Sequence, residues 1–189
     1  MAPLLCDEGV CKDVLDSAFL FKSVAGQINV VIHAVATLVS LPRILEDGET
    51  VEYASLGAGN TGREFDLATD RRVAEFKLIQ WQGGAEAIRQ NQLFKDFFTL
   101  AEYDGNKQRC LYVLGTHHPL KFLNGNRALD SVLSRNDAVK QAFFDKYGDR
   151  YKVVSEYYHA NKHLVEIIDL TEIVPELDHL KPYEKTRVL

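Results

Sequence analysis

The most constraining feature of this chain is a pair of alternating segments, residues 63–69 and 73–82, separated by a very short connection. Polar and apolar residues alternate along each segment with the period of a β-strand. Two such runs joined by a short polar turn predict an antiparallel hairpin. We place its turn at Asp70 and Arg71.

That turn fixes which side chains face each other. Ala68 then pairs with Val73, and Asp66 pairs with Glu75. Directly opposed side chains lie about 5 Å apart at Cβ, and like charges at that distance repel. Lys77 lies on the same face and would neutralise them in part. A divalent cation with a preference for oxygen ligands, Mg²⁺ or Mn²⁺, would do so better.

The alternative is a hairpin whose charged face is open to water. Residues 73–81 (VAEFKLIQW) are nearly apolar throughout, which favours a buried setting for Glu75 and Lys77. On the other strand we expect Phe65 and Leu67 to share the face opposite the acids.

A glycine motif precedes the hairpin. Gly57, Gly59 and Gly62 match the pattern G-x-G-x-x-G of dinucleotide-binding loops. That function requires a helix directly after the glycines, to receive the pyrophosphate. Residues 63–69 alternate like a strand instead, so we interpret the glycines as a turn.

The remaining elements follow from periodicity. Helical spacing predicts helices over residues 18–45, 85–103 and 127–147, with Pro42 ending or kinking the first. We expect strands at 51–56, 110–115 and 164–170; residues 151–160 fit either a helix or a strand, and the tail from Pro175 is expected on the surface.

With these elements in place, the chain resembles the PD-(D/E)XK nuclease superfamily. The matching residues are Asp66 and, after eight intervening residues, the run Glu75-Phe76-Lys77. The order helix, three strands, helix, strand over residues 18–116 is similar too. The resemblance implies an α/β fold with a restriction-endonuclease-like core, a mixed sheet flanked by helices. Residues 120–189 would extend a single domain.

The resemblance also implies site roles. Asp66 and Glu75, with the backbone carbonyl of Phe76, would hold Mg²⁺ or Mn²⁺, and Lys77 would position water or stabilise the transition state. The implied reaction is hydrolysis of phosphodiester bonds, in DNA in preference to RNA. A ribonuclease and a catalytically silent interaction module of the same fold stay open as alternatives.

Other polar residues are candidates for substrate contacts. They flank the hairpin or lie on the following helix: Arg63, Gln80, Gln92 and Lys95. The sequence departs from the superfamily in having Phe65 where a proline usually precedes the aspartate. A further acid often joins this metal site, and the available ones are Glu46, Glu49, Glu52 and Glu64.

Composition limits the cellular setting. The net charge of −5 argues against a protein that coats nucleic acid, but not against an enzyme with a local basic rim. The three cysteines are too few and scattered for a disulfide framework or zinc finger. The apolar run 28–41 is too short to span a bilayer, and we expect it to be a buried helix. We therefore expect a cytoplasmic protein whose partners are DNA and a second copy or a targeting protein.

Overall fold

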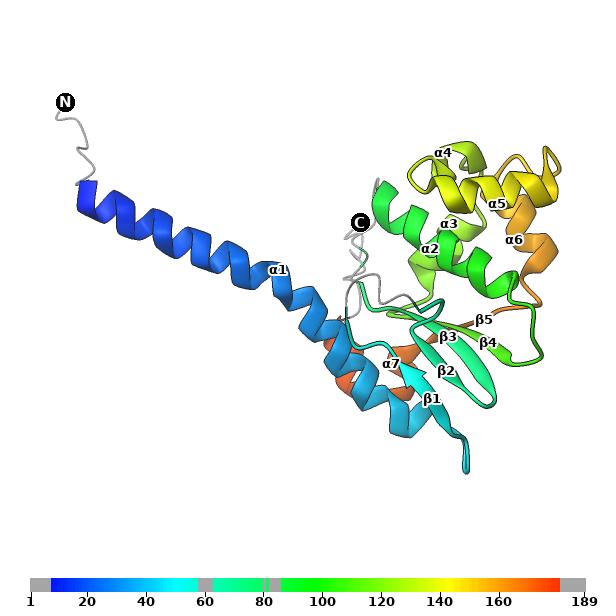
Figure 1. Cartoon of the computed structure of the whole chain (residues 1–189), viewed down its shortest axis with the longest axis horizontal. Helices are drawn as coiled ribbons and strands as arrows, with labels where there is room; N and C mark the ends of the chain where they lie inside the picture. Colours follow the sequence, from blue (N-terminus) through cyan, green and yellow to red (C-terminus); the bar gives the residue numbers. More distant parts are fainter. Residues whose placement is uncertain (1–7, 58–62, 80, 82–85, 181–189) are drawn as a thin grey trace, which may run out of the picture.

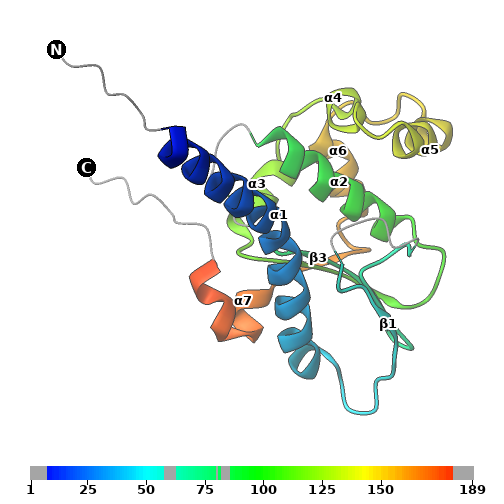
Figure 2. The same cartoon turned by 60° about the vertical axis from the view of Figure 1, so that its left-hand side comes forward.

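The computed structural model describes residues 8–57, 63–79, 81 and 86–180 of the chain. The fold is α/β: a five-stranded mixed sheet with helices on both faces (Figure 1 and Figure 2). Its described elements are, in chain order, α1 (Glu8–Ile44), β1 (Val51–Ala54), β2 (Leu67–Thr69), β3 (Arg72–Lys77), α2 (Ala87–Ala101), β4 (Gln108–Val113), α3 (His117–Leu123), α4 (Leu129–Leu133), α5 (Asp137–Tyr147), α6 (Val154–Asn161), β5 (Glu166–Asp169), α7 (Leu170–Ile173) and the 3₁₀ helix η1 (Pro175–Leu180).

The strands lie in the sheet in chain order, β1-β2-β3-β4-β5. The first three pair antiparallel, while β3–β4 and β4–β5 pair parallel, each across a helical connection. The predicted order of helix, three strands, helix and strand is therefore present. Because β5 joins the same sheet, the C-terminal region contributes to the core sheet as well as to its helical cover.

The hairpin has the predicted register. Ala68 pairs with Val73, and Leu67 pairs with Ala74. The Thr69 hydroxyl fixes the turn, because it accepts hydrogen bonds from the backbone N–H groups of Arg71 (3.0 Å) and Arg72 (2.8 Å). Side chains on either side of the turn are thereby locked into one pairing.

The strands are shorter than the alternation suggested. Of residues 63–69 only Leu67–Thr69 form a strand, and β3 ends at Lys77. The expectation that Phe65 and Leu67 share a face was wrong. Phe65 packs with the core on the α2 side of the sheet, whereas Leu67 packs on the α1 side. Since residues 63–66 are not in a regular strand, the period of two does not extend to Phe65.

Two apolar layers enclose the sheet. An aromatic-rich layer lies under α2–α6, and a smaller one lies under the C-terminal part of α1 and α7 (Figure 1). Residues of β3 alternate between them, with Val73 in the first layer and Ala74 and Phe76 in the second. Glu75 and Lys77 therefore belong to the face that α2 covers.

Helix α1 differs most from expectation. It begins at Glu8 instead of residue 18 and continues to Ile44, two residues beyond Pro42. The expected burial of the run 28–41 was wrong for most of its large side chains, since Ile28 and Val31 are 49% and 57% exposed. In Figure 1 the N-terminal part of α1 projects away from the sheet. None of the helices within the described part of the chain has the length and apolarity needed to cross a membrane.

Most remaining elements match. The buried strand expected at 110–115 is β4, and that at 164–170 contains β5. Residues 151–160 contain a helix, α6. Residues 127–147 are helical as expected and contain two helices, α4 and α5; the side chain of Asn136 caps α5 by accepting from the Val139 N–H (3.1 Å).

Candidate functional site

Three carboxylates and one ammonium group meet on the sheet face that α2 covers. Asp66 immediately precedes β2, while Glu75 and Lys77 lie two residues apart on the same face of β3. Asp96 comes from the middle of α2. The hairpin register brings Asp66 beside Glu75, and the packing of α2 on the sheet adds Asp96.

The backbone holds Asp66 firmly. Its N–H donates to the carbonyl of Ala74 (3.1 Å), and its own carbonyl accepts from the N–H of Ser55 (2.6 Å). Its side-chain Oδ2 accepts from the N–H of Phe76 (3.0 Å). One carboxylate oxygen is thus tied to the strand that carries Glu75.

Glu75 is 8% exposed and lies within the field of two other acids. The pKa of Glu75 is raised to about 10. Burial is the largest cause, followed by the charges of Asp96 and Asp66. Its side chain also hydrogen-bonds to that of Asp66. Without a cation, Glu75 therefore keeps a proton at neutral pH. The alternative of a solvated hairpin face does not hold for this residue.

Lys77 forms an ion pair with Asp96. Burial by itself would lower the pKa of Lys77, but the charge and hydrogen bond of Asp96 outweigh it and the pKa is raised. The pKa of Asp96 is raised by burial, which the charge of Lys77 opposes in part. The ammonium therefore stays protonated.

Sequence reasoning missed Asp96. It is 4% exposed, and its neighbours in α2, such as Phe94, Phe97 and Phe98, are buried apolar side chains. The sequence did carry a signal, because an acid within the apolar stripe of an amphipathic helix requires a buried partner. The candidates that the sequence offered on this helix, Gln92 and Lys95, are exposed.

The expected substrate residues are distributed unevenly. The guanidinium of Arg63 lies 4.8 Å from the ring centroid of Tyr53, and the fields of Arg63 and Glu75 both act on the Tyr53 hydroxyl. Lys95 and Gln92 are exposed on α2, and the charge of Lys95 reaches Asp96. Gln80 lies outside the described residues. Tyr53 is a second member of this region that the sequence did not indicate.

Three of the four acids considered as a further metal ligand lie elsewhere. These three make ion pairs away from Asp66 and Glu75: Glu46 with Arg71 (2.9 Å), Glu49 with Arg72 (2.6 Å) and Glu52 with Lys107 (2.7 Å). Arg72 also donates to the hydroxyl of Tyr112 (3.2 Å), a residue of the α1-side core. The Glu49 pair therefore lies across the sheet from Glu75. The remaining candidate, Glu64, is exposed.

The donor set can be compared with the needs of a metal ion. Among the described residues there is no group of three or more His, Cys, Asp or Glu side chains arranged to hold one. Mg²⁺ is commonly bound through one or two carboxylates, with waters and substrate phosphates completing its shell. Asp66 and Glu75 supply two adjacent hard oxygen ligands that repel each other when both are ionised, and this fits such an ion.

Comparison of this chain with family models, with curated proteins and with solved structures finds no match.

Proposed function

We propose that this chain is a metal-dependent phosphodiesterase, an endonuclease that cleaves DNA, with a core of the restriction-endonuclease-like type. One observation carries the proposal. The buried Glu75, whose pKa is strongly raised, and the half-buried Asp66 lie beside the ammonium of Lys77 at the end of the central strand β3. Buried acids with strongly shifted pKa values beside a specific charged partner are typical of functional sites.

The charge balance supports a cation at this position. If Asp66, Glu75 and Asp96 were all ionised, their three negative charges would face the buried ammonium of Lys77 and, from the surface, the charge of Lys95, which acts on Asp96. Protonation of Glu75 removes one of them. A divalent cation held by Asp66 and Glu75 would replace that proton and neutralise both carboxylates.

The protein groups have separable roles. Asp66 is pre-positioned by its three backbone contacts, and Glu75 must lose its proton before it can act as a ligand. When bound, the metal ion supplies positive charge next to the phosphate and promotes ionisation of water. Lys77, held and kept charged by Asp96, orients the attacking water or stabilises the charge that develops on the phosphate.

A basic rim would hold the substrate backbone. The charge of Lys95 acts on Asp96, and the charge of Arg63 acts on Tyr53, a residue that the charge of Glu75 also reaches. Contacts of this kind position a phosphodiester without reading its sequence. The preference for DNA over RNA rests on the resemblance to the nuclease superfamily.

The test is incubation of the purified full chain with plasmid DNA, and in parallel with RNA, in the presence of Mg²⁺ or Mn²⁺. We compare the wild type with Glu75→Ala and Lys77→Ala. Each substitution is expected to reduce the cleavage rate at least about 100-fold, the usual scale for loss of a group that stabilises transition-state charge. The matched control is Glu64→Ala, because Glu64 is an exposed acid two residues before Asp66. This substitution should leave the cleavage rate unchanged.

Binding of Mn²⁺ provides a readout that does not depend on activity. Calorimetry should show Mn²⁺ binding to the wild type with release of protons, and loss of binding in Glu75→Ala. Cleavage that survives both substitutions would show that the active site lies elsewhere. Absence of both cleavage and Mn²⁺ binding would favour the catalytically silent interaction module.

A further inference from the structure

Helix α1 carries an exposed apolar seam that the proposed function does not use. From Val14 to Leu38, a set of residues that are apolar except for Ser17 recurs in alternating steps of three and four, which is the a and d pattern of a coiled coil. We call this set the α1 seam; its members are Val14, Ser17, Phe21, Val24, Ile28, Val31, Val35 and Leu38. The seven large apolar members are 49–76% exposed.

The α1 seam is distinct from the side of α1 that contacts the rest of the protein. Among the residues of α1 whose burial the structure describes, the buried ones are Ala36, Thr37, Ser40 and Ile44, which occupy positions b, c and f of the same heptad. Near its C-terminus, α1 therefore packs on the core with one side and presents the seam on another. The seam continues without interruption into the part of α1 that projects away from the sheet (Figure 1).

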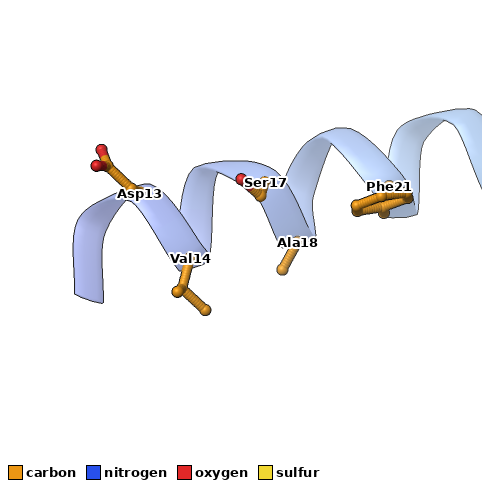
Figure 3. A pocket seen from close by; sticks show the side chains of 5 residues that line it. All are labelled: Asp13, Val14, Ser17, Ala18 and Phe21. Carbon is orange, nitrogen blue, oxygen red and sulfur yellow. The ribbon is translucent and has the colours of Figure 1, made fainter. Parts of the chain in front are cut away.

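A shallow hollow lies on this surface. It is lined by five residues of α1, namely Asp13, Val14, Ser17, Ala18 and Phe21. Three of them belong to the α1 seam, and in Figure 3 Val14 and Ala18 project from the same edge of the helix. A hollow bordered by a and d residues of one helix is the shape that receives a side chain of a second helix in coiled-coil packing.

We infer that a second copy of this chain covers the α1 seam, pairing α1 with its counterpart. Charge distribution favours an identical partner. Between Ser17 and Val39 no charged residue occupies an a, d, e or g position; the one charge in this stretch, Lys22, is at position b. Two identical helices can therefore meet along the seam without repulsion between like charges. Asp13, at a g position, lies at the outer end of the seam; from Ser17 onward, where e and g carry no charge, the seam lacks the usual means of selecting a different partner.

The area is sufficient for a stable dimer. Burying the exposed part of seven large apolar side chains on each of two helices would remove roughly 1,000 Å² from water, at about 60–90 Å² per side chain. Flanking residues such as Ala25 and Val39 would bring the total into the range of about 1,200–2,000 Å² found in specific interfaces. In proteins most of the stability of a helix comes from packing of its apolar face, and a second copy would supply that packing to the projecting part of α1.

The test measures the oligomeric state of the full chain by light scattering coupled to size exclusion. The wild type should have about twice the monomer mass of 21.4 kDa. Ile28→Lys with Val31→Lys, two changes in the seam, should give the monomer mass. Leu15→Lys with Phe19→Lys adds the same charge at exposed positions outside the seam and should leave the dimer intact.

Circular dichroism shows whether the seam variant is folded. If it is not, the milder pair Ile28→Ala with Val31→Ala retains helix-forming residues and should weaken the dimer at least about tenfold in Kd. A wild-type monomer would overturn the inference, as would equal dissociation of seam and control variants. Monomeric wild type that sediments with phosphatidylcholine vesicles would instead show that a lipid surface covers the seam.

Discussion

Replacing Glu75 by Gln tests the electrostatics of the site without any assumption about catalysis. Glutamine is nearly isosteric with glutamate and can keep the hydrogen bond to Asp66, but it never carries a charge. In the folded protein Glu75 is protonated at neutral pH, because its pKa is about 10. In the unfolded chain the pKa of Glu75 is near its ordinary value of 4.5, so the side chain is ionised at neutral pH.

The sign of the effect follows from proton binding. Between about pH 4.5 and 10 the folded state holds a proton that the unfolded state has lost, so this group lowers the free energy of unfolding as the pH rises. Each unit of difference is worth about 1.4 kcal/mol. In the absence of metal, Glu75→Gln should therefore raise the free energy of unfolding by at most about 5 kcal/mol near pH 8, which lies about 3.5 pH units above the ordinary pKa of 4.5. The gain should disappear below about pH 4, where the glutamate is mostly neutral in both states.

Urea denaturation in the presence of EDTA, at about pH 5 and pH 8, measures this difference. Glu64→Gln is the matched control, because that side chain is exposed and its replacement should change stability by less than about 0.5 kcal/mol at either pH. Equal effects of Glu75→Gln at the two pH values would refute the reasoning, and so would a loss of stability near pH 8. Either outcome would mean that Glu75 is ionised in the folded protein.

Three further results are expected. Mg²⁺ at about 10–100 times its Kd should raise the free energy of unfolding of the wild type by about 1.4–2.7 kcal/mol, measured by thermal unfolding, and should leave Glu75→Gln unchanged. Asp96→Asn should weaken the pH dependence attributed to Glu75, because Asp96 is the acid whose charge contributes most to its raised pKa; the same urea series detects this. Glu49→Gln should cost about 2–3 kcal/mol at pH 7, because the Arg72 guanidinium loses its buried partner. The pKa of Glu49 is lowered to about 2, so its contribution is lost as the pH falls from about 4.5 towards 2, and urea curves at pH 7 and pH 3 should reveal this.

The sequence was sufficient to predict the hairpin and the charges on it. Alternation with a period of two, together with a turn at Asp70 and Arg71, led to the observed pairing of Ala68 with Val73. Because one pair of residues fixes the register of the whole hairpin, this pairing also predicted that Asp66 lies beside Glu75. The order of the elements as far as β4 was predicted in the same way, from periodicity and breaks.

The sequence was less informative where a tertiary contact decides the outcome. The contribution of Asp96 depends on how α2 lies across the sheet, which no local spacing specifies. The separation of Phe65 from Leu67 depends on the chain leaving the regular strand before β2. For α1, apolar residues at helical spacing indicated burial, but most of the large ones are exposed to solvent. A periodic apolar stripe predicts that a helix needs a covering surface, and does not say whether this surface belongs to the same chain.

The two faces of β3 show why the acid cluster stands apart from an ordinary buried ion pair. On one face Glu49 and Arg72 balance each other, and the guanidinium has a further acceptor in Tyr112. The pKa of Glu49 is accordingly lowered, and that pair stabilises the fold. On the other face the described residues place three carboxylates around the single ammonium of Lys77, and the pKa of Glu75 is raised. The same strand can therefore accommodate a balanced pair, so the excess of acid around Glu75 is not imposed by the fold. A local conflict of this kind is expected where an interaction from outside the chain supplies the missing charge.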